Sequence, residues 1–327
     1  MSRTAAGNLF NCINCQKKWY LPQKITEVPE LKEHTFDYQG LPVSYRVTGS
    51  GPPLLMIHGW GSSARVMLPL ARSLSDIRTC YVPDLPGFGE TPAPKAPWTI
   101  GDYAGLARTF TKEVIGGPVD VLAHSFGGRM VLKWASDSAR GKGTGDKSGM
   151  ISASGHTKPG PDHHTDGNAA DSVPGSELRK IIITGGAGMK PRRSFSYYRR
   201  RVTAMILKAP FVLLPGALRL KAMDWLRGTS VWKSLGSSDY QKLEGVMRET
   251  FVKTVSEHLE NCLPDISQEV LLLWGKEDEA TPWYQAERME KGLANGALVG
   301  LERAGHYAFL DQPDHFQRIV RAFLVAE

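Results

Sequence analysis

A serine stands where an apolar run meets a segment of helical character. The pattern lies in Val121-Leu122-Ala123-His124-Ser125-Phe126-Gly127-Gly128-Arg129 and predicts a strand that ends at Ser125, with a helix directly after it. Such a turn strains the serine backbone and projects its Oγ above the sheet as a nucleophile. Ala123 and Gly127 are small enough for strand and helix to approach closely, although the usual G-x-S-x-G pattern has glycine at position 123. Taken alone, the motif leaves an ordinary helix N-cap as the alternative.

A second loop follows the apolar run Leu54–Ile57 and reads His58-Gly59-Trp60-Gly61. Where a nucleophile stands on such a turn, the loop after the third strand supplies the second donor of the oxyanion hole. We therefore expect the hole to consist of the backbone N–H groups of Trp60 and Phe126. The two glycines let the loop fold close to the reacting carbonyl. His58 is interpreted as a residue that braces the loop, not as the catalytic base.

The elements that must position these motifs alternate along the chain from Glu33 onward. Continuous apolar runs are typical of the buried strands of a mostly parallel sheet, and they cover Pro53–Ile57, Thr79–Val82, Val119–Ala123, Lys180–Thr184, Val270–Trp274 and Ala297–Leu301. Helical periodicity is found over Ser63–Leu74, Ile100–Ile115, Arg129–Ser136 and Pro313–Val325. Ahead of them, Thr35–Asp37 and Val43–Val47 predict an antiparallel hairpin. The alternation predicts a doubly wound α/β sheet with its ligand chemistry at the carboxyl ends of the strands.

Three motifs together resemble the α/β-hydrolase superfamily, namely His58-Gly59-Trp60-Gly61, Asp84-Leu85-Pro86-Gly87-Phe88-Gly89 and Ala123-His124-Ser125-Phe126-Gly127-Gly128. The resemblance covers nearly all of Glu33 to Glu327. It implies the α/β-hydrolase fold with an inserted helical cap, as in small bacterial serine hydrolases. The Asp84–Gly89 segment resembles the loop that shapes the floor of the site in that family.

The resemblance also points to the acid that orients the base. After the penultimate predicted strand, Gly275-Lys276-Glu277-Asp278-Glu279-Ala280-Thr281-Pro282 resembles the family pattern G-x-x-D-x-x-x-P and implies Asp278. Glu277 and Glu279 are the competing carboxylates. Some family members carry the acid after the sixth strand instead, where this chain reads Thr184-Gly185-Gly186-Ala187-Gly188 without a carboxylate. That absence favours Asp278.

The base is expected after the last strand, in the order nucleophile, acid, histidine. Ala304-Gly305-His306-Tyr307-Ala308 lies there, just before the C-terminal helical pattern. His124 adjoins the nucleophile but is expected to point away from it. In this arrangement His306 takes the proton of Ser125, and Asp278 fixes the imidazole tautomer.

The chemistry that follows is hydrolysis of a small or medium carboxylic ester through an acyl-enzyme intermediate. It requires neither a metal nor an organic cofactor. C–C bond hydrolysis of a dienoic keto-acid uses the same triad and stays open as an alternative. A hydrolase-like protein that only binds a ligand is the alternative outside the enzymes, and the full triad disfavours it because binding does not require all three residues.

The net charge of +7 is concentrated in one segment. Between Lys190 and Lys233 there are eleven basic residues and one acid, Asp224, so the rest of the chain is slightly acidic. The segment is either a solvated surface that attracts anions non-specifically or a surface that recruits anionic substrates or an acidic membrane. No helix-turn-helix or zinc-finger pattern accompanies the charge, so nucleic-acid binding is not expected. The oligomeric state is left open.

The domain organisation follows from where the strand–helix rhythm breaks. We expect an N-terminal extension over 1–32, a hydrolase core made of 33–187 and 265–327, and a helical cap over 188–264 between the sixth and seventh core strands. Within the core, 137–177 is rich in Gly, Ser, Asp and His and has almost no bulky apolar residue. We expect it to be a disordered surface insertion.

The cysteines and the N-terminus give little sign of a further site. Cys12 and Cys15 form a C-x-x-C without a second ligand pair at the usual spacing, so no metal site is predicted. No apolar run reaches the ~18 residues of a transmembrane helix. The first 24 residues lack the apolar core of a secretory signal, and a cytoplasmic location is expected.

The composition of 137–177 predicts that the fold does not depend on it. Replacing this segment with a short Gly/Ser linker should leave the free energy of unfolding within about 1 kcal/mol, because loop closure depends only weakly on length. Thermal unfolding of the shortened protein checks this. Loss of soluble protein would contradict it.

Overall fold

The computed structural model describes residues 30–141, 177–192 and 243–326, together with separate positions between 202 and 229. The Cys12–Cys15 pair therefore lies outside the described residues. So do most of the basic segment and the bulk of the expected insertion. The division into extension, core and cap stays a prediction.

The first two strands form the predicted antiparallel hairpin. β1 (Lys32–Tyr38) and β2 (Leu41–Thr48) pair with Tyr38 opposite Leu41. Gln39 and Gly40 connect them with φ of 55° and 79°. The right-handed twist of paired strands favours a type I′ turn, and this turn requires a positive φ at both of its central residues. Gly40 takes up such a value without steric cost.

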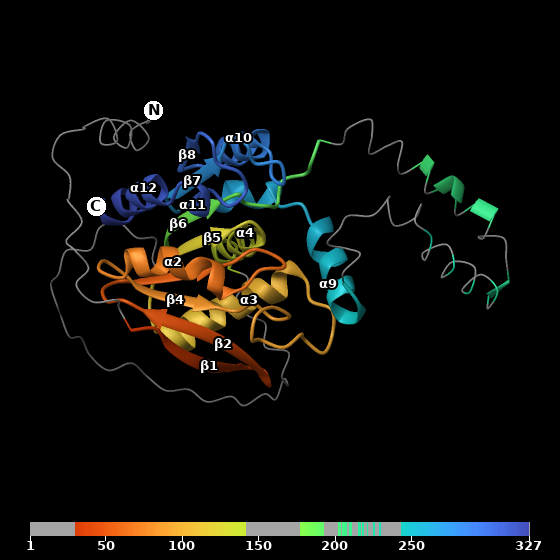
Figure 1. Cartoon of the computed structure of the whole chain (residues 1–327), viewed down its shortest axis with the longest axis horizontal. Helices are drawn as coiled ribbons and strands as arrows, with labels where there is room; N and C mark the ends of the chain where they lie inside the picture. The colour runs from red at the N-terminus through yellow and green to blue at the C-terminus, as the bar shows by residue number, and fades with distance from the viewer. Residues whose placement is uncertain are drawn as a thin grey trace, which may run out of the picture.

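An eight-stranded sheet forms the centre of the described chain, in the order β1-β2-β4-β3-β5-β6-β7-β8 (Figure 1). Apart from the antiparallel pairs β1–β2 and β2–β4, neighbouring strands are parallel. The remaining strands are β3 (Pro53–Ile57), β4 (Thr79–Pro83), β5 (Val119–His124), β6 (Leu178–Thr184), β7 (Val270–Gly275) and β8 (Gly296–Leu301). The six apolar runs are confirmed as strands, and apart from the edge strand β8 they are largely buried in the sheet.

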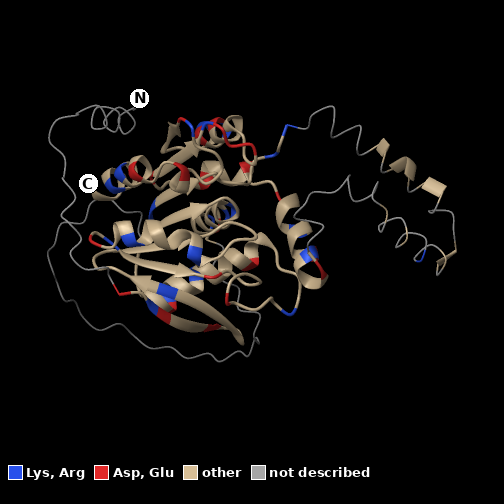
Figure 2. Ribbon diagram, viewed as in Figure 1, with Lys and Arg blue, Asp and Glu red and all other residues tan. Residues whose placement is uncertain are grey.

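Helices cover both faces of the sheet, which makes the fold a doubly wound α/β sandwich (Figure 1). One apolar core joins the sheet to α3 (Ile100–Phe110), α4 (Phe126–Ala139) and α10 (Trp283–Gly292). The other joins it to α2 (Ala64–Leu74), α11 (Ala308–Asp311) and α12 (Pro313–Val325). Figure 2 shows charges of both signs interspersed on α10 and α12, as expected for helices with one solvated face.

Three helical details differ from the expectations. The stretch predicted over Ile100–Ile115 divides into α3 and a π-helical turn, Thr111–Ile115. α4 continues beyond Ser136 to Ala139, and Lys133 pairs with Asp137 at 2.7 Å, so the start expected for the insertion is wrong by several residues. The linker variant should therefore keep α4 intact. α10 was not predicted, because its sequence is mostly polar and buries little beyond Ala286 and Met289.

Two further elements lie between β6 and β7, within the stretch where the cap is expected. They are α9 (Gly245–Ser256) and a 3-10 turn over Glu260–Asp265. Among the described helices, none is long and apolar enough to cross a membrane.

A buried ion-pair network fixes the loop after β4. Arg46 on β2 is 2% exposed, and its guanidinium lies 3.0 Å from a carboxylate oxygen of Asp84 and 2.6 Å from one of Glu90. Asp84 also accepts the N–H of Ala64 at 2.6 Å, the first residue of α2. Ser63 precedes this helix but forms no side-chain hydrogen bond to it. The N-terminus of α2 is therefore capped by Asp84, which is distant in the sequence. One carboxylate thus connects β2, α2 and the Asp84–Gly89 loop.

Removing the charge of Arg46 should destabilise the fold strongly. In Arg46→Met the carboxylate of Asp84 stays buried without its cation, which costs about 3 kcal/mol or more. The matched control is Arg65→Met, because Arg65 is 76% exposed and also pairs with Glu90; exposed pairs contribute less than about 1 kcal/mol. Urea unfolding of both variants checks the difference, and equal losses would contradict the role given to Asp84.

Candidate active site

The backbone of Ser125 has the conformation expected of a nucleophile on a sharp turn. Its φ is 51° and its ψ is −108°, values that residues with a side chain rarely adopt. Two hydrogen bonds hold it there. The Ser125 N–H donates to the Thr184 carbonyl at 3.0 Å, and the Ala187 N–H donates to the Ser125 carbonyl at 2.9 Å. Residues at and just after the end of β6 therefore hold both the N–H and the carbonyl group of Ser125 in place.

Close backbone approach around the turn explains the small residues that flank it. A Cβ on Gly127 would lie 2.8 Å from the backbone oxygen of Ile57, and one on Gly59 would lie 3.1 Å from the Cβ of Ser125. Ala123 is fully buried at the end of β5. The serine thus sits where the loop after β3, the end of β5 and the start of α4 meet.

The structure brings the three residues predicted for the triad together. His306 Nε2 lies 3.0 Å from the Oγ of Ser125, and His306 Nδ1 lies 2.9 Å from Oδ2 of Asp278. The three residues follow β5, β7 and β8, whose carboxyl ends meet at one edge of the sheet. The Asp278 side chain is fully buried, whereas that of His306 keeps 21% exposure.

Asp278 is held as an ionised acceptor by its own loop. Its Oδ1 accepts the N–H groups of Ala280 at 2.9 Å and Thr281 at 2.8 Å, and its Oδ2 accepts the Thr281 hydroxyl at 2.8 Å. Burial raises the pKa of Asp278, but hydrogen bonds from His306 and Thr281 outweigh burial and hold that pKa below its usual value. The competing Glu277 and Glu279 are exposed.

The loop after β6 approaches this pair so closely that it must lack a side chain. Gly185 has a φ of 54°, and a Cβ there would lie 3.0 Å from His306 Nδ1 and 3.2 Å from Oδ2 of Asp278. The missing carboxylate after β6 is thus a steric requirement of placing the acid after β7. Thr281, which sequence reasoning missed, stands three residues after Asp278 in the same motif.

The N–H groups expected to form the oxyanion hole belong to Phe126, directly after the serine, and to Trp60 in the loop after β3. Phe126 is the first residue of α4, so its N–H has no acceptor within the helix. Trp60 lies in the loop after β3, and its ring packs against those of Phe126 at 5.1 Å and Phe88 at 4.9 Å. These ring contacts fix the loop that carries the Trp60 amide.

His58 contacts the loop that carries Trp60, consistent with the supporting role that the sequence predicts. Its Nε2 accepts the N–H of Leu85 at 3.0 Å, and its Nδ1 lies 2.8 Å from the carbonyl oxygen of Gly59. The side chain is completely buried, and burial lowers the pKa of His58 to about 4. A neutral imidazole therefore connects the loops after β3 and β4.

His124 supports the base from the opposite side of the turn. Its Nε2 donates to the backbone carbonyl of His306 at 3.1 Å, and its ring packs on that of Tyr307 at 4.7 Å. Burial, together with the neighbouring His306, lowers the pKa of His124 to about 3. This neutral side chain holds the loop that carries His306, a contact that the sequence did not indicate.

α9 lies across the loops that border the serine. The Phe251 ring packs on Trp60 at 5.1 Å, and a Cβ on Gly87 would lie 2.3 Å from the Met247 methyl group. Arg129, which sequence reasoning also missed, lies one turn after Ser125 on α4. It donates to the backbone oxygens of α9 at Thr254 (3.0 Å) and just beyond it at Glu257 (2.6 Å).

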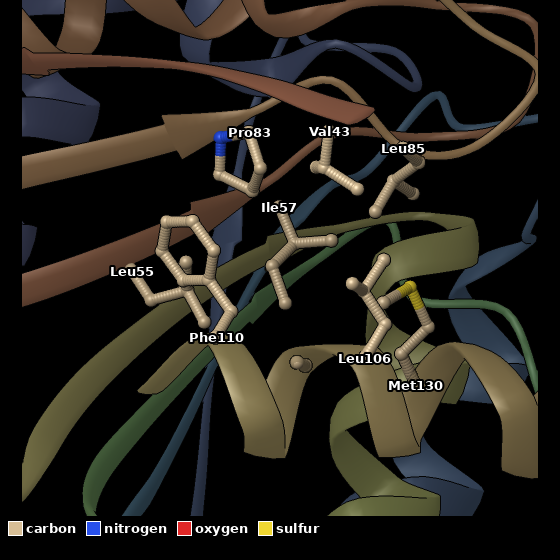
Figure 3. Close-up of a pocket in the computed structure, with 9 residues that line it drawn as sticks. Val43, Leu55, Ile57, Pro83, Leu85, Leu106, Phe110 and Met130 are labelled. Carbon is tan, nitrogen blue, oxygen red and sulfur yellow. The ribbon is translucent and has the colours of Figure 1, made fainter. Parts of the chain in front are cut away.

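Two cavities differ sharply in what they can hold. The one in Figure 3 lies between α3, α4 and the sheet, has a volume of about 10 Å³ and is lined only by apolar residues such as Ile57 and Phe110, so it is a packing gap. The other has about 390 Å³ and lies beside Asp278, because it is lined by Thr281, whose hydroxyl donates to that carboxylate. In the described part of the chain, no cluster of three or more His, Cys, Asp or Glu side chains is placed to hold a metal ion.

A strained serine above the carboxyl edge of a mostly parallel, doubly wound sheet defines the class of the protein as an α/β-hydrolase fold. Residues 54–316 match the Alpha/beta hydrolase family, and the chain belongs to that family. The resemblance drawn from the motifs is thereby confirmed.

Individual relatives agree with this assignment. An uncharacterized protein of Mycobacterium tuberculosis is 25% identical over 285 residues, 86% of this chain and 77% of that protein. A pimeloyl-(acyl-carrier protein) methyl ester esterase of Shewanella oneidensis is 50% identical over 48 residues, 15% of this chain and 18% of that protein. The solved 2-hydroxy-6-oxo-6-phenylhexa-2,4-dienoate hydrolase of a Rhodococcus species shares the fold, with a TM-score of 0.60 and 18% identity over 91% of this chain and 100% of that one.

The turn geometry makes Gly127 the most sensitive glycine of the site. In Gly127→Ala the new methyl group should push strand and helix apart, destabilise the fold by about 1–3 kcal/mol and slow fluorophosphonate labelling of Ser125. The control is Gly117→Ala, because a Cβ at Gly117 meets nothing within 4 Å; its effect should stay within about 0.5 kcal/mol. Thermal unfolding and labelling rates measure both, and unchanged labelling of Gly127→Ala would contradict the proposed constraint.

Proposed function

We propose that the protein is a serine hydrolase that cleaves carboxylic esters of small or medium size through an acyl-enzyme intermediate. The observation that carries the proposal is the hydrogen-bonded series from Ser125 Oγ through His306 to Asp278, with contacts of 3.0 and 2.9 Å. Nucleophile, base and orienting acid are each within reach of the next, which is the arrangement that nucleophilic acyl transfer requires.

The reaction begins when His306 Nε2 takes the proton of Ser125 as the Oγ attacks the ester carbonyl. Asp278 accepts from Nδ1, which leaves Nε2 free as the base and stabilises the imidazolium that forms. The same histidine then gives its proton to the departing alcohol. Water, activated by His306, attacks the acyl-serine and releases the acid, so that the free hydroxyl of Ser125 is restored.

The negative oxygen of each tetrahedral intermediate needs donors that are fixed in advance. We assign this role to the N–H groups of Trp60 and Phe126, which lie at the two backbone elements closest to the serine. Each such donor contributes about 3 kcal/mol to transition-state stabilisation. The buried and neutral His58 keeps the Trp60 loop in place and does not compete for the proton of Ser125.

We favour ester cleavage over C–C bond hydrolysis of a dienoic keto-acid as the reaction. The local similarity at 50% identity is to a methyl ester esterase, whereas the likeness to the dienoate hydrolase is one of fold at 18% identity. The dienoic keto-acid therefore belongs in the substrate panel as the competing compound.

Replacing either of the two proton-sharing residues should abolish turnover. Ser125→Ala and His306→Ala are each expected to lower kcat for a p-nitrophenyl ester by about 10³-fold or more, with the double variant little worse, because residues of one triad act as a unit. Steady-state kinetics and fluorophosphonate labelling measure this.

Matched controls are Ser73→Ala and His315→Ala, since both residues lie on helices away from the site. They should keep wild-type turnover. Residual activity of Ser125→Ala with an unchanged substrate profile would refute the proposed nucleophile, and cleavage of the keto-acid without any ester cleavage would refute the proposed reaction.

A further inference from the structure

The pocket of about 390 Å³ beside the triad contains a buried cation. Arg129 is 7% exposed, lies on α4 one turn after Ser125 and lines this pocket. Gln285, Ser256 and His258 also line it, together with Ala187 and Thr281 on the triad side. A ligand in the pocket thus meets Arg129 and other polar side chains, and it lies beside Thr281, whose hydroxyl donates to Asp278.

The guanidinium of Arg129 has only uncharged hydrogen-bond partners in the described part of the chain. Nη1 donates to the carbonyl oxygens of Thr254 at 3.0 Å and Glu257 at 2.6 Å, and Nη2 lies 3.5 Å from that of Val255. A guanidinium carries five N–H donors, so the Nε–H and the second N–H of Nη2 are left. Neither forms a hydrogen bond within the described residues, and no carboxylate pairs with this side chain there.

A buried and incompletely paired charge is costly. Burial lowers the pKa of Arg129 to about 10, which still leaves the side chain charged near neutral pH. The carbonyl groups at the end of α9 contribute only the partial negative charge of a helix C-terminus, and the carboxylates of Glu257 and Glu260 act on Arg129 without forming an ion pair with it, so the compensation is partial. A full negative charge in the pocket would complete the compensation.

The two remaining N–H donors indicate which anionic group would fit Arg129. Nε and Nη2 make up one edge of the planar guanidinium, and two parallel N–H bonds on such an edge match the two oxygens of a carboxylate. Along α4, Arg129 stands about 6 Å from Ser125, one helical turn. The pocket can therefore receive a carboxylate carried a short distance from the ester that reacts.

We propose that Arg129 is a specificity-determining residue that binds a carboxylate of the substrate, so that the enzyme prefers half-esters of short dicarboxylic acids over neutral esters. The inference rests on the proposed ester hydrolysis and adds the class of substrate. It also differs from recruitment by the basic segment between Lys190 and Lys233. A buried contact survives high salt, whereas attraction to a surface charge beyond about 10 Å is screened.

The test compares monomethyl with dimethyl esters of succinic, adipic and suberic acid. For the preferred chain length, wild-type kcat/KM should be at least about tenfold higher for the half-ester, in line with a charge-assisted hydrogen bond. The preference should persist at 1 M salt. Arg129→Met should reduce the ratio by about tenfold or more, and the control Arg140→Met, which removes a charge paired with Asp265 from the far end of the same helix, should keep it.

Because Arg129→Met also removes the bonds to α9, a second variant keeps them. Gln285→Glu places a carboxylate in the pocket, where it should pair with Arg129 and abolish the preference for half-esters. Gln317→Glu on α12 adds the same charge outside the pocket and serves as its control. Equal kcat/KM for half-esters and diesters in the wild type, or a preference unchanged in both pocket variants, would overturn the proposal.

A binding measurement separates this inference from the proposed reaction. Calorimetry on Ser125→Ala should show hexanoate binding at least about tenfold more tightly than hexanamide, with the difference lost when Gln285→Glu is added. If that difference is found while the wild type cleaves no ester, the pocket assignment stands and the proposed reaction fails. If ester cleavage is found and hexanoate binds no better than hexanamide, the pocket assignment fails alone.

Discussion

The backbone of Ser125 is held at a positive φ of 51° by two hydrogen bonds to the segment that follows β6. Such a conformation costs about 1–3 kcal/mol for a residue with a side chain, and the buried sheet on either side offsets this cost. The sharp turn brings neighbouring backbone segments so close together that Gly59 and Gly127 have no room for a side chain, whereas Gly185 is confined by His306 and Asp278. The small residues around Ser125 therefore follow from one strained position, and the glycine after β6 follows from the placement of His306 and Asp278.

His306, the proposed base, is held in place by groups that do not themselves react in the proposed mechanism. Asp278 holds its Nδ1 edge, and the buried His124 holds its backbone carbonyl. His58 does the same for the loop that carries the Trp60 amide. Burial keeps both supporting histidines neutral, with pKa values lowered to about 3 and 4, so they can act as fixed hydrogen-bonding groups beside a histidine that must change its charge in each cycle.

Strands and triad could be predicted from the sequence because each leaves a local pattern. Apolar runs mark strands buried on both faces, and a small residue on either side of Ser125 marks the turn. Asp278 needed the family pattern, because Glu277 and Glu279 are adjacent carboxylates and only the fold shows that they are exposed while Asp278 reaches His306. Arg129 and Thr281 were missed for another reason: their roles depend on partners brought near by the fold, such as α9 for Arg129. α10 was missed because a short, mostly polar helix has too narrow an apolar stripe to stand out.

In the proposed reaction the acyl group passes through a covalent bond to Ser125. The most direct measurement is an acid quench of the enzyme during turnover of an activated ester, followed by intact mass spectrometry and peptide mapping. We expect one acyl group per chain, attached to Ser125, formed in a burst before steady state and absent from Ser125→Ala. Steady-state ester cleavage without any burst or adduct, or an adduct on another residue, would contradict it.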